Sequence, residues 1–138
     1  MDIDARGPRF GAAVTTVVLA VVLITGSSWL LAWQTLAFAL GTAGGVARSP
    51  YGWVFRTAVR PRIGPPTEFE APEPPRFAQT VGLVFAGVGL VGLALGPEWL
   101  GLAATGAALA AAFLNAAFGY CLGCEMYLLV RRVAVRAE

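Results

Sequence analysis

The chain has 138 residues, which is enough for a single domain, and its composition is that of a membrane protein. Hydrophobic residues make up 57% of it and charged residues only 13%, so a soluble domain of this size could not bury its apolar surface in one core. The net charge of +2 is too small to indicate a nucleic-acid partner. Histidine, the commonest general base and metal ligand, is absent.

Four apolar runs are each close to the length of about 20 residues that a membrane-spanning helix needs. In chain order they cover residues 10–25, 29–47, 77–95 and 99–118. Short breaks at residues 26–28 (Gly-Ser-Ser) and 96–98 (Gly-Pro-Glu) separate the first from the second and the third from the fourth. We therefore predict an all-α, polytopic membrane protein with four transmembrane helices in two antiparallel hairpins, forming a single domain over residues 1–138.

The arginines indicate how the hairpins are oriented. All ten basic residues are arginines, and they precede the first run, lie between the second and third, or follow the fourth: Arg6, Arg9, Arg48, Arg56, Arg60, Arg62, Arg76, Arg131, Arg132 and Arg136. The two short breaks contain none. Because positive charge collects on the cytoplasmic side, we expect both termini and the loop 48–76 to face the cytoplasm of a bacterial inner membrane.

The predicted cytoplasmic loop has two parts. Residues 51–59 mix aromatic and aliphatic residues with arginine, which favours a short helix in the membrane interface, with Trp53, Arg56 and Arg60 at the lipid head groups; an ordinary loop is the alternative. Residues 61–75 contain six prolines, which predicts an extended segment without a core.

The two hairpins resemble each other. Arg-Phe opens both, at residues 9–10 and 76–77, and Trp-Leu opens the second span of each, at residues 29–30 and 99–100. Both hairpins begin and end on the same side, so a duplication would give a parallel repeat related by an axis along the membrane normal. Such short matches also arise from composition alone, and both explanations stay open.

Small and polar residues mark the expected helix contacts. Gly41 with Gly45, and Gly92 with Gly96, have the four-residue spacing that lets two backbones approach closely in a bilayer. Gln34 and Asn115 are expected to form hydrogen bonds between helices. The cores of the spans contain no Asp, Glu or Arg, which argues against a proton-coupled carrier.

The sequence offers one chemically reactive pair, Cys121 and Cys124, which are its only cysteines. If the fourth helix continues through them, their spacing places both sulfurs on one helix face. Such a pair can cycle between dithiol and disulfide, carry a persulfide, or supply half of a tetrahedral site for Zn²⁺ or another soft metal. Arg131 and Arg132 favour the reactive thiolate, whereas Glu125 opposes it. The cytoplasmic position predicts a dithiol at rest.

Three segments carry a resemblance to a known family: residues 61–64 (Pro-Arg-Ile-Gly), residues 75–79 (Pro-Arg-Phe-Ala-Gln) and residues 119–127 (Gly-Tyr-Cys-Leu-Gly-Cys-Glu-Met-Tyr). Over nearly its whole length the chain resembles small integral membrane proteins of actinobacterial type, a domain-of-unknown-function family numbered four-three-nine-five. The resemblance implies a membrane location and no established activity. A hairpin ending in Gly-x-Cys is also similar to the membrane part of some bacterial rhodaneses, which implies sulfur chemistry at the inner face.

Three functions from different classes fit the sequence. In the first, Cys121 and Cys124 are the catalytic residues of a thiol relay that exchanges a disulfide or persulfide with a thioredoxin-like or rhodanese-like cytoplasmic protein, without a cofactor. In the second, the protein is a non-enzymatic membrane anchor or assembly partner. In the third, the same cysteines bind a soft metal at the interface of a homodimer, whose second copy supplies the remaining ligands.

Overall fold

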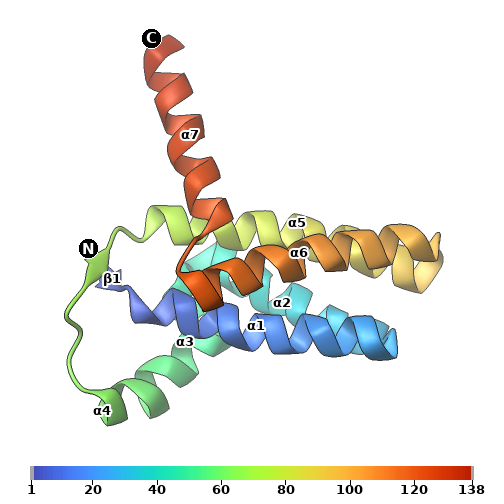
Figure 1. The fold of residues 1–138 in the computed structure, drawn as a ribbon, viewed down its shortest axis with the longest axis horizontal. Coiled ribbons are helices and arrows are strands. Elements are labelled where there is room, and N and C mark those ends of the chain that lie inside the picture. Colours follow the sequence, from blue (N-terminus) through green and yellow to red (C-terminus); the bar gives the residue numbers. More distant parts are fainter. Residues whose placement is uncertain (1, 138) are drawn as a thin grey trace.

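Four long helices form the body of the protein in the computed structural model, which describes residues 2–137 (Figure 1). They are α1 (Arg6–Thr25), α2 (Ser28–Gly44), α5 (Glu73–Leu95) and α6 (Glu98–Phe118), and a further helix, α7 (Leu122–Ala137), follows α6. The predicted all-α class is confirmed.

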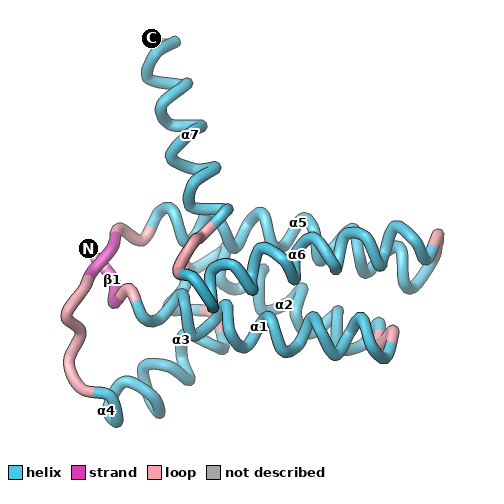
Figure 2. The backbone as a smooth tube through the Cα atoms, in the orientation of Figure 1, coloured by secondary structure: helices cyan, strands magenta, loops and turns pink. Residues whose placement is uncertain are grey.

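The segment between α2 and α5 is more ordered than its prolines indicate (Figure 2). It contains a 3-10 helix η1 (Val46–Arg48), α3 (Pro50–Val54), a π-helical turn η2 (Phe55–Val59), α4 (Arg60–Ile63) and β2 (Phe69–Glu70). Strand β2 pairs in antiparallel register with β1 (Ile3–Asp4). The expectation of an extended segment over residues 61–75 needs correction at its ends, because residues 61–63 belong to α4 and the first turn of α5 begins at Glu73; the part between them contains the paired strand β2.

Helices α1 and α5 begin before the apolar runs that predicted them. They start at Arg6 and Glu73 rather than near residues 10 and 77. Pro8 lies in the first turn of α1, and Pro74 and Pro75 lie in the first turn of α5. Proline is tolerated there because the first backbone N–H groups of a helix have no intrahelical partner to lose.

The helices lie side by side, with both hairpin turns at one end of the molecule and the termini, the segment α3–α4 and α7 at the other (Figure 1). α2 packs along α5, α5 along α6, and α6 along α1, whereas α1 and α2 contact each other less. All the arginines belong to the elements at the end opposite the hairpin turns. The molecule thus has one end rich in arginine and one end without it.

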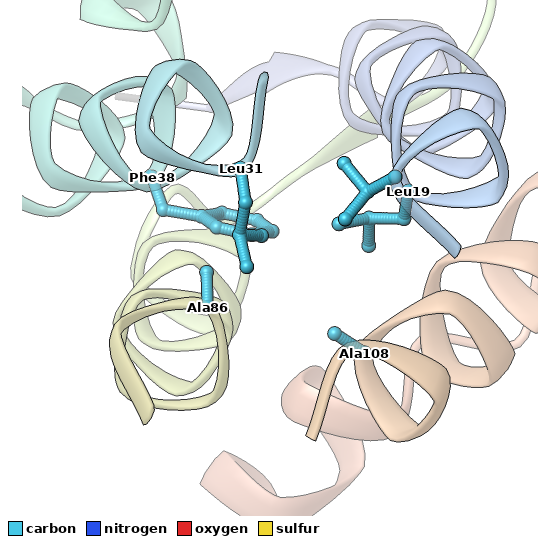
Figure 3. Packing of buried hydrophobic residues seen from close by; sticks show 6 residues of the cluster. Leu19, Leu31, Phe38, Ala86 and Ala108 are labelled. Atoms are coloured by element: carbon cyan, nitrogen blue, oxygen red, sulfur yellow. The ribbon is translucent and has the colours of Figure 1, made fainter. Parts of the chain in front are cut away.

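The centre of the bundle is built from large side chains on α1 and α2 that face small residues on α5 and α6 (Figure 3). Leu19 and Leu31 are fully buried, and Phe38 packs close to Ala86. A Cβ atom at Gly82 would lie 2.6 Å from the ring of Phe38, so only glycine leaves room for this ring. The small residues of the second hairpin therefore set how closely α5 approaches α2.

A chain of hydrogen bonds crosses three elements near the arginine-rich end. The amide nitrogen of the fully buried Gln34 donates to Oγ1 of Thr15 on α1 (3.2 Å), and the hydroxyl of Tyr51 on α3 donates to Oε1 of Gln34 (2.6 Å). The indole N–H of Trp33 in turn donates to the Tyr51 hydroxyl (3.1 Å). The prediction that Gln34 bonds between helices is confirmed, and the chain ties α3 to the bundle.

Three of the helices, α1, α5 and α6, are long and apolar enough to cross a membrane. Their surfaces fit this environment, since large apolar side chains such as Ile24 on α1 and Leu95 on α5 are more than 80% exposed. Helix α2 has 17 residues and is about 25 Å long at 1.5 Å per residue, shorter than a bilayer core of about 30 Å.

The two glycine pairs divide between helix contacts and helix ends. A Cβ at Gly41 would lie 2.8 Å from Cδ of Gln79, and one at Gly92 would lie 2.6 Å from Cα of Gly101, so both glycines are packed against another helix. Gly45 and Gly96 instead end α2 and α5 with positive φ angles of 87° and 91°. The four-residue spacing thus does not place both members of either pair in a helix interface, because the second member supplies a backbone conformation that glycine adopts without strain.

Candidate functional site

The cysteine pair lies at a break between two helices. Helix α6 ends at Phe118, and Gly119 has a left-handed conformation (φ 70°) with its N–H bonded to the carbonyl of Asn115 (2.9 Å). Helix α7 then begins at Leu122. The sequence left open whether the fourth helix continues through both cysteines. It ends where the fourth apolar run ends, because the chain turns at Gly119, which takes the left-handed conformation common at helix C-termini.

Cys121 occupies the N-cap position of α7. Its carbonyl accepts the first helical hydrogen bond, from the N–H of Glu125 (3.0 Å). Its Sγ accepts a hydrogen bond from the backbone N–H of Cys124 (3.1 Å), the bond that a serine or aspartate side chain makes at this position. The sulfur of Cys121 therefore lies at the positive end of the α7 dipole, where a thiolate is favoured over a thiol.

The two sulfurs are close enough to bond. Cys121 and Cys124 form a disulfide in the structure, with their Cα atoms 5.2 Å apart, inside the usual range for this bond. Both residues are half-buried. The pair is therefore placed for a disulfide, and the predicted resting dithiol stays a prediction.

Close packing holds the first turn of α7 against α5. Gly123, between the cysteines, is buried, and a Cβ on it would lie 2.6 Å from Cα of Ala78. The backbones of α7 and α5 touch at this point, and any larger residue would force them apart. Gly123 therefore fixes the position of the cysteine pair relative to the bundle.

A cation lies beside the bend that precedes the cysteines. The guanidinium of Arg9 on α1 donates to the carbonyl of Ala116 (3.2 Å), and a Cβ on Gly119 would lie 3.6 Å from its Cζ. Arg131, in contrast, donates to the hydroxyl of Tyr127 (3.2 Å), further along α7. From the sequence, Arg131 and Arg132 were predicted to be the positive charges near the cysteines, and Arg9 was used only as an indicator of topology. The antiparallel packing of α1 on α6 is what brings Arg9 to this bend.

A cavity of about 310 Å³ opens beside Cys121, at the arginine-rich end of the bundle. This volume is at the low end of the range for small-molecule sites. The lining is largely apolar, and its polar members include Thr15, Gln79 and Asn115. Asn115, which the sequence placed in a helix contact, is half-buried and lines this cavity. Cys121 is part of the wall, so a group bound in the cavity would lie against this residue.

The residues predicted for the membrane interface lie apart from the cysteines, on the helical segment from α3 to α4. Trp53 is exposed. Arg56 donates to the carbonyl of Ala47 (2.9 Å), and Nε of Arg60 lies 3.9 Å from the carboxylate of Asp4. The hydrogen-bonded guanidinium of Arg6 lowers the pKa of this carboxyl below its usual value, with a smaller contribution from Arg60. Arg56 and Arg60 thus have partners within the chain.

No group of three His, Cys, Asp or Glu side chains that could hold a metal ion occurs among residues 2–137. Cys121 and Cys124 supply two sulfurs, so the soft-metal alternative requires ligands from a second copy.

A protein-family model described as Domain of unknown function (DUF4395) matches residues 3–132. The chain belongs to this family. The resemblance inferred from the sequence motifs is confirmed, and the matched region contains the bundle, the bend at Gly119 and both cysteines. No curated protein and no solved structure matches the chain. DUF4395 carries no activity in its description, so the function has to be argued from the site itself.

Proposed function

We propose that this DUF4395 protein is a four-span protein of the bacterial inner membrane that exchanges disulfides with a thioredoxin-like or rhodanese-like protein of the cytoplasm through Cys121 and Cys124. The observation that carries the proposal is the placement of Cys121 at the N-terminus of α7, where its sulfur accepts the N–H of Cys124. This setting favours the thiolate, the form that attacks a disulfide.

The exchange follows from the order of the two cysteines. In the reduced protein, the Cys121 thiolate attacks a sulfur of the partner's disulfide, forming a mixed disulfide and releasing the partner's other sulfur as a thiolate. Cys124 then loses its proton and attacks Sγ of Cys121, which forms the Cys121–Cys124 disulfide and frees the partner's second sulfur. Two electrons pass to the partner, whose two thiolates take up protons. The reverse sequence reduces this protein, and a persulfide would be received by the same Cys121 thiolate.

Four spans with cytoplasmic termini account for the arrangement of the helices. Helix α2 is short, but it runs antiparallel to α1 and packs along α5. The chain enters α1 and leaves α2 on the same, arginine-rich side. If α1 crosses the membrane, α2 must therefore cross it in the opposite direction. The positive-inside rule assigns that side to the cytoplasm, where the cysteine pair would also lie.

A parallel repeat of the two hairpins is supported by their contacts. α1 packs on α6, and α2 packs on α5, so each hairpin uses its first helix to contact the second helix of the other. After the second helix of each hairpin, α3 packs against α1 and α7 packs against α5. These reciprocal contacts are those that a duplication would leave, and we include the duplication in the proposal.

The mixed disulfide offers a direct test of the exchange. With Cys124→Ser, the Cys121 thiolate has no resolving neighbour, so we expect a dithiothreitol-sensitive adduct with a cytoplasmic protein, which mass spectrometry would identify. The matched control is the double variant Cys121→Ser, Cys124→Ser, which should form none. In the unaltered protein, mild oxidation should protect both cysteines from alkylation and thioredoxin should expose them again. Cysteines that stay alkylatable after oxidation would contradict the proposal and favour the anchor or the soft-metal site.

The orientation has its own test in intact cells. In the background Cys121→Ser, Cys124→Ser, we expect a membrane-impermeant maleimide to label Ser28→Cys and Glu98→Cys, which lie at the hairpin turns, but not Thr67→Cys in the loop before α5. The last variant should label only after the cells are permeabilised, because the arginine-rich end faces the cytoplasm. Labelling of Thr67→Cys in intact cells would contradict the proposed orientation and indicate the opposite one.

A further inference from the structure

Helix α7 leaves the bundle crosswise to the four long helices (Figure 1). Its N-terminal part packs against α5, where the buried Gly123 contacts Ala78 and the ring of Tyr127 lies 5.7 Å from the ring of Phe77. Beyond that part, most of the side chains of α7 are exposed as far as Arg136. If the bundle axis follows the membrane normal, a helix that runs crosswise from the end of the bundle lies along the membrane surface.

One face of α7 is apolar and uncovered. Met126, Leu129, Val130 and Val133 have the spacing of one helix face, and their side chains are between 46% and 59% exposed. Met126 also lines the cavity beside Cys121, whereas Leu129, Val130 and Val133 each leave more than half of the side chain exposed. An apolar stripe of this kind on a water-exposed helix is costly, so another surface is expected to cover it.

The charges on α7 indicate what that surface is. Arg131 and Arg132 lie outside the apolar stripe, and Arg136, seven residues after Leu129, lies at its edge near the end of the helix. Against these three arginines the helix carries one acid, Glu125, in its first turn. An apolar face combined with basic residues outside it is the pattern of helices that lie in the interface of a membrane with anionic lipids.

We propose that α7 lies in the head-group region of the cytoplasmic leaflet, with Leu129, Val130 and Val133 toward the acyl chains and its arginines at anionic head groups. The bundle in the same membrane places α7 there without a separate binding step. The first turn then stays at the boundary between lipid and water, which keeps Cys121 and Cys124 within reach of a soluble partner. This inference uses the membrane topology proposed above but not the chemistry of the cysteines.

Spin labels on adjacent residues of α7 would test the inference. In the background Cys121→Ser, Cys124→Ser, a nitroxide is attached at Val133→Cys, on the apolar face, or at Arg132→Cys, on the charged side, and the protein is placed in nanodiscs that contain phosphatidylglycerol. We expect the label at position 133 to be relaxed mainly by oxygen, which concentrates in lipid, and the label at position 132 mainly by a water-soluble nickel chelate. In phosphatidylcholine alone the contrast should decrease, because the arginines lose their anionic partners.

Two results would overturn the inference. Equal relaxation of both labels by the nickel chelate in anionic nanodiscs would mean that α7 stands in water. Strong coupling between labels at position 133, lost when labelled protein is diluted with unlabelled protein, would mean that a second copy covers the apolar face. Nanodiscs have no inside or outside, so this test does not depend on the orientation, and the serine background separates it from the test of disulfide exchange.

Discussion

Gly92→Leu is expected to lower the free energy of unfolding by about 1–3 kcal/mol, the usual cost of overfilling a packed interface, whereas Gly87→Leu should stay within about 0.5 kcal/mol of the unaltered protein. A Cβ at Gly92 would lie 2.6 Å from Cα of Gly101, so a side chain there pushes α5 and α6 apart. A Cβ at Gly87 meets nothing within 4 Å among the described residues. Both substitutions replace glycine by leucine on α5, so they differ mainly in this contact.

The comparison is made by unfolding the purified variants in detergent, followed by circular dichroism and by the yield of monodisperse protein. The gain in helix propensity from removing glycine is the same for both variants and cancels. Equal stability of Gly92→Leu and Gly87→Leu would show that α5 and α6 are not held by this backbone contact.

The body of the fold could be predicted because it depends on features that a sequence displays directly. Apolar runs of suitable length and breaks rich in glycine define the long helices. Arginines confined to alternate connections indicate that the bundle has one arginine-rich end. The helix starts were missed because Pro8, Pro74 and Pro75 were taken as loop residues, although the first turn of a helix accepts proline. The pairing of β1 with β2 joins residues far apart in the sequence, and no local sequence pattern predicts it.

The site was predicted in its residues but not in its geometry. Cys121 and Cys124 were identified from their spacing and the fourth span was predicted to end at residue 118, but whether the helix continues through the cysteines was left open; the answer depends on Gly119. A glycine directly after an apolar helical run is a known stop signal, so this part could have been found from the sequence. The amphipathic pattern of residues 122–137 was also present in the sequence, where periods of three and four residues predict a helix. The approach of Gly123 to Ala78 and of Arg9 to the bend depends on tertiary packing and could not have been found in this way.

Gly123→Ala is expected to slow the reaction of the reduced cysteine pair with a maleimide at pH 6 roughly tenfold, while the bundle remains folded; this corresponds to about 1.4 kcal/mol of lost thiolate stabilisation. The added Cβ would lie 2.6 Å from Cα of Ala78, so the first turn of α7 must move away from α5. That movement disturbs the N–H of Cys124, which donates to Sγ of Cys121, and with it the thiolate.

The matched control is Gly106→Ala on α6, where a Cβ meets nothing within 4 Å in the described part of the chain. This variant should label at the rate of the unaltered protein and gain slightly in stability, because alanine is the better helix former. Labelling rates are compared at pH 6 and pH 8. A specific effect of Gly123→Ala should be largest at pH 6 and diminish at pH 8, where thiolate is more abundant in every variant. If Gly123→Ala and Gly106→Ala label at the same rate at both pH values, the packing of α7 on α5 does not affect the reactivity of the Cys121 sulfur. Any stabilisation of the thiolate would then come from the N-terminus of α7 independently of this packing.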